Sequence, residues 1–372
     1  MAPDSPTQAS QSSRLMSLDA LRGFDMFWIM GGKGIVLAAA ALTNWTALVW
    51  LAGQLEHPEW HGFTLYDLIF PLFLFMAGAA MPFSYEKRLT AGDSKADLYR
   101  HAIVRGCVLV LFGMIYNGLL KFDWATMRYP SVLGRIGLAY MFAALITLNT
   151  NVRGRLLWFV GLLVGYWAAL KLIPVPGYGA GDLSPGHTLT DYIDRSLIPG
   201  RLLHGNRDPV ALFGTIPAIG TALAGVLTGD FLKSPRYSGG KKSAAMVVMG
   251  AVCVALAKLW DLSFPINKNI WSSSFVLYCA GWSLLLLAIF YLVIDVWRWR
   301  KWAYFFVVIG SNSILIYMAQ QFIDFGFTTQ FFFGGALQHT GAYQPLMLAV
   351  ALVLVEWLFL WLLYEKRIFL KV

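Results

Sequence analysis

LIFPLFLFMAG, residues 68–78, is an unbroken apolar run that starts directly after Asp67. It belongs to a candidate span at 65–85, and a helix that crosses the hydrocarbon core of a bilayer needs about 20 mostly apolar residues. Nine further segments share this length and character: 24–45, 102–120, 131–149, 155–174, 210–231, 244–261, 272–296, 302–324 and 345–364. The sequence therefore predicts an all-α fold, a polytopic transmembrane helical bundle of about ten helices.

The composition agrees with a membrane protein. Hydrophobic residues make up 58% of the chain, charged residues 13%, and the mean hydropathy is +0.60, whereas a soluble domain carries roughly 25% charge. The 15 Trp and 16 Tyr residues suit aromatic belts at the two membrane interfaces. A net charge of +9 would favour nucleic-acid binding in a soluble protein. In a membrane protein it reports loop orientation, so we expect the lipid bilayer, and no nucleic acid, as partner.

The distribution of Lys and Arg predicts the orientation. With the N-terminus in the cytoplasm, 19 of the 29 Lys and Arg residues lie on the inner side. Six lie in the outer loops: Lys121, Arg128, Arg195, Arg201, Arg207 and Lys268. The positive-inside rule then places both termini in the cytoplasm. The predicted organisation is a cytoplasmic segment at 1–23, one transmembrane domain at 24–364 and a cytoplasmic tail at 365–372.

Two stretches depart from regular spans. Gly31, Gly32, Lys33 and Gly34 interrupt the first span, which fits either the wall of a cavity or a helix kink. The outer loop 175–209 is rich in Gly and Pro. A loop of this length is usually functional or disordered, and it fits either a lid over an external site or a plain connector.

The inner side carries a basic cluster directly before the first span. Arg14, Asp19 and Arg22 lie in RLMSLDALRG, residues 14–23, and Asp19 and Arg22 are three residues apart on one helix face. Because Arg binds phosphate bidentately, the cluster fits a basic entrance for a phosphorylated ligand. An interfacial anchor is the alternative interpretation.

The outer side carries EHPEWHGFTLYD, residues 56–67, with two histidines and three carboxylates. The unperturbed pKa of histidine, roughly 6.5, suits a general base, and Asp67 is placed to orient such an imidazole. Metal ligation competes with this interpretation, but His57 and His61 have no third ligand at a fixed spacing, so we predict no metal. Interfacial histidines bonded to the backbone are the third interpretation.

Other polar residues lie inside predicted spans, where they are costly and functional by default. Arg135 needs a partner or a cavity. The serines at 272–274 fit a helix cap or a set of donors for a bound ligand. Asn312 fits a hydrogen bond to a neighbouring helix or a donor to a developing oxyanion.

Taken together, six stretches resemble the heparan-α-glucosaminide N-acetyltransferase family and its bacterial relatives of the NagX type. They occur in family order within residues 14–317: RLMSLDALRGFDMFWIMGG, HPEWHGFTLYDLIFPLFLFMAG, RYPSVLGRIGLAY, DPVALFGTIPAIG, FPINKNIWSSSFVLYCAG and GSNSILIY. The second and fifth are long and specific, and the resemblance covers nearly the whole chain.

This resemblance implies an enzyme that takes the acetyl group from cytoplasmic acetyl-CoA and delivers it to the amine of a glucosamine-type sugar on the lumenal or periplasmic side. The family's essential histidine lies in H-x-x-W-x-G-x-x-x-x-D-L-x-F-P. That motif matches His57, Trp60, Gly62, Asp67, Leu68, Phe70 and Pro71. His57, rather than His61, therefore takes the catalytic role. The resemblance also implies a homodimer in the bacterial inner (cytoplasmic) membrane.

Two departures from the family matter. Its external motif D-P-E-G reads Asp208-Pro209-Val210-Ala211 here, which puts a substrate contact in doubt. The stretch between Gly32 and His57 is longer than in the animal enzymes, so the residues of the first span have no secure counterparts.

For acyl transfer from a thioester to an amine, we predict that His57 is the base, that Asp67 orients it, and that Asn312 or Ser273 stabilises the tetrahedral intermediate. The phosphates of acetyl-CoA would stay on the inner side while the pantetheine arm enters a hydrocarbon core about 30 Å thick. The predicted cofactor contacts are Arg14, Arg22, Arg100, Arg105 and Ser273. The predicted sugar contacts are Glu56, Trp60, Arg135, Asp208, Asn267, Lys268 and Trp271.

A transporter for N-acetylglucosamine or a related amino sugar is the main alternative, because midplane polar groups and an interrupted first span suit transport. Against it, the sequence has no paired discontinuous helices and no inverted repeat. An assembly factor with a degenerate site is a third hypothesis, which the intact His57 and Asp67 disfavour. The sequence leaves open which sugar accepts the acetyl group and whether His57 is itself acetylated.

Overall fold

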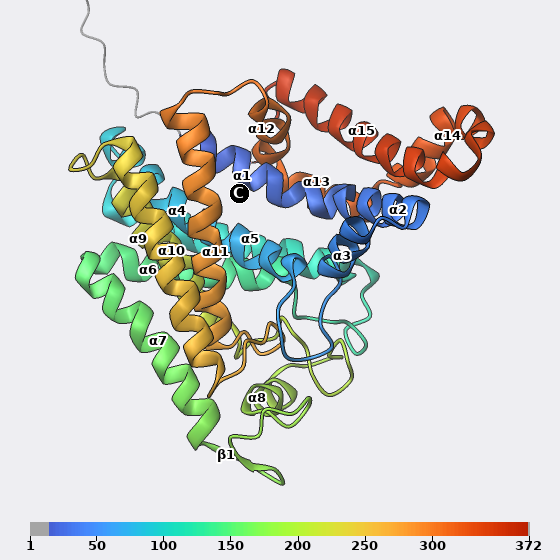
Figure 1. Ribbon diagram of the computed structural model, residues 1–372. Helices are drawn as coiled ribbons and strands as arrows, with labels where there is room; N and C mark the ends of the chain where they lie inside the picture. The colour runs from blue at the N-terminus through green and yellow to red at the C-terminus, as the bar shows by residue number, and fades with distance from the viewer. Residues whose placement is uncertain (1–14, 371–372) are drawn as a thin grey trace, which may run out of the picture.

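The computed structural model describes residues 15–370 and is almost entirely helical (Figure 1). Within these residues, nine helices or continuous helix runs are long and apolar enough to cross a membrane. A tenth span is a pair of helices bent by 67°. The predicted all-α polytopic bundle of about ten spans is confirmed, and the protein is a multi-pass membrane protein.

The first span consists of α1 (Met16–Phe27), the π-helical turn η1 (Trp28–Gly32) and α2 (Lys33–Thr43). The second consists of the 3₁₀ turn η2 (Leu65–Leu68) and α4 (Ile69–Thr90). The next six are α5 (Lys95–Tyr116), α6 (Val132–Asn149), α7 (Val152–Leu172), α9 (Thr215–Lys233), α10 (Gly239–Asp261) and α11 (Ser273–Tyr291), which continues into η4 (Leu292–Val296). The bent pair is α12 (Ala303–Ser311) and α13 (Ser313–Phe322), and the last span is α15 (Gln344–Glu365), preceded by α14 (Phe325–Leu337) and η5 (Gln338–Tyr343).

Shorter elements lie in the connections. They are α3 (Thr46–Gln54), η3 (Leu119–Lys121), the two-stranded antiparallel pair β1 (Pro174–Val175) and β2 (Gly179–Ala180), and α8 (Leu189–Leu197). The long connections gather at one end of the bundle, around α8 and β1 in Figure 1. The loop predicted at 175–209 therefore contains structure of its own.

The apolar run LIFPLFLFMAG forms the centre of the bundle. Of the most apolar window in the α4 span, 83% is buried, against 17% in the α7 span and 22% in the α10 span. A helix that is apolar all round is typically buried. The α4 helix is buried in this way, in part by its packing against α9. At Gly78 of α4 and at Gly225 and Gly229 of α9, an added Cβ would collide with backbone of the facing helix. Small residues thus let the two helices approach closely.

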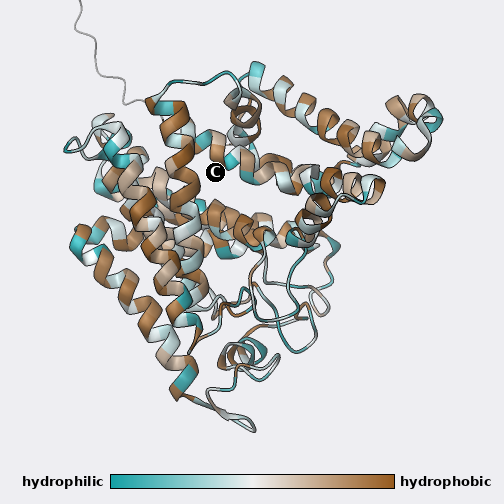
Figure 2. Ribbon diagram, in the orientation of Figure 1, coloured by the Kyte–Doolittle hydropathy of each residue, from teal (hydrophilic) through white to brown (hydrophobic). Residues whose placement is uncertain are grey.

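The outer helices present apolar side chains to the surroundings. Figure 2 shows hydrophobic residues along the helices and hydrophilic residues mainly at their ends and in the loops. On α14, Phe327, Phe331 and Phe332 are each about 70% exposed. Such a surface is stable in contact with lipid chains, while the helical backbone satisfies its own hydrogen bonds.

The helix that contains the first span begins at Met16, before the predicted span at 24–45. α1 starts at Met16, within the segment expected to precede the membrane, and Ser17, Leu18 and Leu21 are buried. The reason is its packing on α12, where Gly23 and Gly310 bring the two backbones into contact. Long-range packing of this kind leaves no mark on local hydropathy.

The glycine-rich stretch of the first span is a kink. Gly31 has φ 158° and ψ −4°, outside the helical region, at the π-helical turn. A Cβ there would meet Val353 of α15, and none of residues 31–34 lines the cavity described below. Of the two interpretations left open, the kink is the one that the structure shows.

Candidate active site

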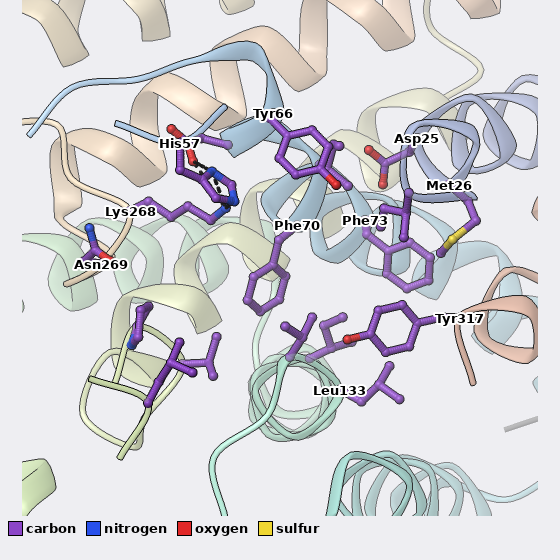
Figure 3. A pocket seen from close by; sticks show the side chains of 18 of the residues that line it. Asp25, Met26, His57, Tyr66, Phe70, Phe73, Leu133, Lys268, Asn269 and Tyr317 are labelled. Carbon is purple, nitrogen blue, oxygen red and sulfur yellow. Dashed lines mark hydrogen bonds and ion pairs between the residues drawn. The ribbon is translucent and has the colours of Figure 1, made fainter. Parts of the chain in front are cut away.

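A cavity of about 580 Å³ opens among the long connections and extends between the helices. Its apolar walls come from α1, η1, α4, α6 and α13, including Met26, Phe70, Phe73 and Ile136. Its polar groups cluster at the loop end, where the lining includes His57, Asp67, Arg128, Arg207 and Lys268. Figure 3 shows the side chains of His57 and Lys268 converging at one side of this space.

The first turn of the α4 span fixes Asp67. Its Oδ2 accepts the backbone N–H of Thr64 at 3.1 Å, and the Asp67 N–H donates to the Thr64 carbonyl at 3.0 Å. This reciprocal cap holds a carboxylate that is fully buried. The other oxygen, Oδ1, lies 2.6 Å from Nδ1 of His57. The predicted His–Asp pair is therefore present as a direct hydrogen bond.

Lys268 completes the cluster from the opposite side. Its ammonium lies 3.2 Å from Oδ1 of Asp67 and 3.3 Å from Nε2 of His57. Burial lowers the pKa of Lys268 below its ordinary value of 10.5, and the attraction of the Asp67 carboxylate partly offsets that shift. This lysine, predicted as a sugar contact, lines the cavity and touches both members of the His–Asp pair.

A tight turn presents Lys268. The Oδ1 of Asn267 accepts the backbone N–H groups of Asn269 at 2.7 Å and Ile270 at 3.2 Å, and the N–H of Asn267 donates to the Ser272 hydroxyl. Asn267 itself is fully buried and does not line the cavity. Its contribution is to the shape of the turn.

The structure separates the two histidines. The Asn267 amide lies 3.2 Å from Nδ1 of His61, and burial lowers the pKa of His61, opposed by the charge of Asp261. A neutral His61 accepts that amide hydrogen bond and ties the His57 segment to the Lys268 turn. His57 is half exposed and lines the cavity. It is thus the imidazole placed to meet a ligand.

Two predicted sugar contacts, Arg135 and Trp271, are buried in the protein core. The guanidinium of Arg135 donates to the carbonyls of Pro209 and Ala211, both at 2.7 Å, and stacks 5.1 Å from the Trp271 ring. Trp271 is fully buried and donates to the Thr221 hydroxyl at 3.2 Å. Neither residue lines the cavity. They hold the segment that follows Asp208 against the bundle.

Asp208 also acts through a neighbour. Its carboxylate binds Arg128 bidentately, at 2.6 and 2.8 Å, and accepts the N–H groups of Leu203 and Val210. Arg128, Leu203 and Val210 line the cavity, but Asp208 does not. Asp208 thus organises the part of the cavity wall that these neighbours form, and a direct contact between Asp208 and a sugar stays a prediction.

Trp60 and Glu56 also lie away from the cavity wall. The indole of Trp60 donates to the Leu183 carbonyl at 2.7 Å and lies 4.6 Å from the Arg207 guanidinium. It thereby fixes the loop that supplies Arg207 to the cavity. Glu56 is exposed and pairs with Lys33 at 3.0 Å.

Asn312 and Ser273 are not near the cluster. Asn312 lies at the bend between α12 and α13, where its amide donates to the Ile368 carbonyl at 2.8 Å and accepts the Leu370 N–H at 3.0 Å. Ser273 is fully buried and donates to the Leu163 carbonyl at 2.7 Å. Neither lines the cavity, so the geometry gives no support to their predicted role as oxyanion donors.

The predicted cofactor arginines lie toward the other ends of the spans. Arg22 pairs with Asp19 at 3.3 Å, Arg100 is exposed, and Arg105 stacks 4.5 Å from the Tyr140 ring. None of these three lines the cavity. Arg14 falls outside the described residues. A role for them in holding phosphate stays a prediction.

Sequence reasoning missed Arg128 and Arg207. A signal was present, because only six Lys and Arg residues lie in the predicted outer loops, and three of them line the cavity: Arg128, Arg207 and Lys268. Because the positive-inside bias disfavours Lys and Arg in outer loops, the few that occur there are candidates for a functional role. Among the described residues, no group of three or more His, Cys, Asp or Glu is placed to hold a metal ion.

Comparisons with known proteins agree with the resemblance that the motifs carry. The family model described as "Domain of unknown function (DUF5009)" matches residues 14–171. The heparan-alpha-glucosaminide N-acetyltransferase of Homo sapiens is 28% identical over 412 aligned residues, covering 95% of this chain and 60% of the human protein. The mouse (Mus musculus) protein of the same name is 27% identical over 430, covering 98% and 62%. The chain thus spans about three fifths of the length of these curated relatives.

Proposed function

We propose that the protein is a transmembrane N-acetyltransferase that moves an acetyl group from cytoplasmic acetyl-CoA to the amine of a glucosamine-type sugar on the periplasmic side of the bacterial cytoplasmic membrane. The observation that carries the proposal is the contact of His57, Asp67 and Lys268 at the polar end of a cavity that continues between the helices. The names of the two relatives support the same reaction class.

His57 acts as the base. With its Nδ1–H donated to Asp67, His57 carries its lone pair on Nε2, which faces the Lys268 ammonium at 3.3 Å and accepts a proton from the acceptor amine when the substrates enter between them. Asp67 fixes this tautomer and stabilises the imidazolium that forms. The amine nitrogen bonds to the thioester carbonyl carbon, the carbon–sulfur bond breaks, and the proton held by His57 leaves with the thiolate of CoA.

Lys268 supplies positive charge. Its ammonium is within 3.3 Å of Nε2 of His57, so a carbonyl that meets the amine beside this nitrogen develops its negative charge next to the ammonium. A donor positioned at the site of developing charge, shielded from water, is the strongest electrostatic aid to acyl transfer. Lys268 therefore takes the oxyanion role that the sequence had suggested for Asn312 or Ser273.

The membrane fold suits two substrates that arrive from opposite sides. The loops bring the polar cluster to one end of the bundle, where a sugar enters from water. The apolar part of the cavity leads inward from that cluster, and an extended thioester arm fits such a passage. In this arrangement neither substrate crosses the membrane.

The test uses purified wild-type protein and the His57→Ala variant with acetyl-CoA and glucosamine, with free thiol as readout. We expect sugar-dependent release of CoA that falls by about 10²- to 10⁴-fold in the variant. His187→Ala is the matched control, because His187 also pairs with an aspartate, Asp182, at 3.1 Å, yet does not line the cavity.

Two results would contradict the proposal. One is acetylated sugar forming at the wild-type rate in His57→Ala. The other is uptake of N-acetylglucosamine into vesicles without acetyl-CoA, as the transporter hypothesis requires. Radiolabelled acetyl-CoA without sugar then distinguishes an acetylated His57 from direct transfer, because only the former leaves label on the protein.

A further inference from the structure

Asp25 is a further ionisable group in the same cavity, apart from the polar cluster around His57, and the reaction described above does not use it. It lies on α1, is 2% exposed and lines the cavity. Its Oδ2 has no hydrogen-bond partner among residues 15–370. Figure 3 shows Asp25 and Lys268 on opposite sides of the cavity, with the Asp25 carboxyl turned toward the side on which Tyr66 lies.

The unpartnered Oδ2 of Asp25 needs an explanation. A carboxyl group within a membrane span is costly unless it is hydrogen-bonded. Asp67 and Asp208, which are equally buried, have partners for both oxygens. Arg22, one turn earlier in α1, pairs with Asp19. A ligand that occupies the cavity would therefore supply the hydrogen-bond donor that the Asp25 carboxyl lacks.

The surroundings of Asp25 limit the chemistry of that ligand. Figure 3 draws Tyr66, Phe73 and Met26 closest to it among the labelled residues, and all three line the cavity. A strongly hydrated or multiply charged group would lose its water there without compensation. An extended, mostly apolar chain that carries a few N–H groups fits both the walls and the open carboxyl oxygen.

The depth of Asp25 indicates the side from which the ligand comes. Asp25 lies nine residues after Met16, or about 14 Å along α1 at 1.5 Å per residue. It is therefore closer to the start of the first span than to the end of that span, which leads to the His57 loop. A molecule that contacts both Asp25 and His57 extends through the membrane interior.

We propose that Asp25 accepts a hydrogen bond from an amide N–H of the pantetheine arm and so positions the acyl donor with its thioester toward His57. This inference rests on the proposed function, because the donor is taken to be acetyl-CoA. Asp25 is a positioning residue: it holds the arm, while His57 and Lys268 act on the reacting atoms.

The experiment measures KM for acetyl-CoA, KM for glucosamine and kcat in wild type, Asp25→Leu and Asp25→Asn. Loss of a hydrogen bond to a buried N–H raises KM for acetyl-CoA in Asp25→Leu by about tenfold or more. KM for glucosamine stays unchanged. Asp25→Asn retains a carbonyl oxygen that accepts the N–H, so it recovers most of the affinity for the donor.

A donor series sharpens the assignment. Acetyl-CoA and S-acetylpantetheine both carry the two amides, whereas ethyl thioacetate has none. The ratio of kcat/KM between wild type and Asp25→Leu should be large for the first two donors and close to one for ethyl thioacetate, as in a double-mutant cycle. Glu356→Leu is the matched control. Glu356 is also a carboxyl within a span, 2% exposed and with an unpartnered Oε2 among the described residues, but it lies outside this cavity.

Binding of acetyl-CoA to the purified proteins, measured by calorimetry, distinguishes a failure of the Asp25 assignment from a failure of the proposed function. Wild-type binding and turnover with an unchanged donor KM in Asp25→Leu would overturn this inference and leave the proposed function standing. A rise in KM for glucosamine instead of acetyl-CoA would likewise overturn it, because the carboxyl would then serve the sugar. Wild-type protein that neither binds acetyl-CoA nor turns over would remove both.

Discussion

Asp67 and Asp208 have side chains that are both fully buried, and each bonds to backbone N–H groups and to a cation, yet only Asp67 lines the cavity. Asp208 binds Arg128 through both oxygens and also accepts hydrogen bonds from two backbone N–H groups. Asp67 uses one oxygen for the cap at Thr64 and the other for His57 and Lys268. The difference lies in the partners, since an arginine keeps its proton at any working pH whereas a histidine exchanges its own.

The comparison teaches that burial and charge alone do not identify a catalytic carboxylate. The sequence predicted that Asp67 orients His57 and that Asp208, in a stretch that departs from the external family motif, contacts the sugar. The structure gives Asp208 only permanent partners, so we expect it to contribute to stability. It gives Asp67 a hydrogen bond to His57, the residue proposed as the base, so we expect Asp67 to contribute to turnover.

Asp67→Asn should show the largest effect. The amide can still cap the helix at Thr64, but it cannot accept the Nδ1–H of His57 and stabilise an imidazolium as a carboxylate does. We expect kcat to fall by about 10³-fold with little change in thermal stability. Initial rates of CoA release and a melting curve in detergent check this, and a variant that melts far below wild type would make Asp67 structural, like Asp208.

Asp208→Asn should show the reverse pattern. Removal of one partner leaves the Arg128 charge in a largely buried position, which costs about 3 kcal/mol. We expect a lowered midpoint of thermal or denaturant unfolding, while kcat of the protein that remains folded stays within severalfold of wild type. A loss of kcat as large as that of Asp67→Asn, with unchanged stability, would place Asp208 in the reaction after all.

Lys268→Met should lower kcat by about 10²-fold, the typical effect of losing one oxyanion donor. In wild type, burial depresses the pKa of Lys268 below 10.5, so the charged, active form is present at lower pH and is lost as pH rises through that depressed value. The rate should therefore decline on the alkaline side at a pH below 10.5.

In Lys268→Arg this alkaline decline should move beyond the accessible range, because a guanidinium stays protonated. Lys121→Met serves as control, since Lys121 is exposed in another connection on the same side and does not line the cavity. An alkaline decline that is identical in wild type and Lys268→Arg would assign the titration to another group.

Glu56→Gln should show the smallest effect. Glu56 pairs with Lys33 in water-exposed surroundings, and such a pair contributes less than about 1 kcal/mol. We expect KM for glucosamine and the melting midpoint to stay close to wild type. A tenfold rise in KM for glucosamine would restore the sugar contact predicted from the sequence.

The spans could be predicted because each depends on local composition. The run after Asp67 and nine similar segments are visible in the residue order itself. The early start of α1 and the bend at Asn312 could not be predicted in this way. The start depends on contact with α12, and the bend involves backbone groups of Ile368 and Leu370, 56 and 58 residues away along the chain.

The site divides in the same manner. His57 and Asp67 are ten residues apart, so their pairing is within reach of a local argument. Lys268 lies 211 residues from His57, and only the fold shows that it reaches the imidazole. Arg135, Asp208, Asn267 and Trp271 were predicted from the sequence as sugar contacts. Their contacts, however, are with the protein itself, because a residue that shapes a site and one that lines it look alike in sequence.

The bend at Asn312 has a practical consequence. The Asn312 amide forms hydrogen bonds with the backbone of Ile368 and Leu370. The adjoining helix α13 supplies Ser313, Ile314 and Tyr317 to the cavity wall. Cutting the chain after Glu365, or fusing a bulky reporter close behind Leu370, would break these two hydrogen bonds and leave the buried Asn312 amide without partners. The shape of the cavity thus depends on backbone groups that lie 56 and 58 residues further along the chain, at Ile368 and Leu370.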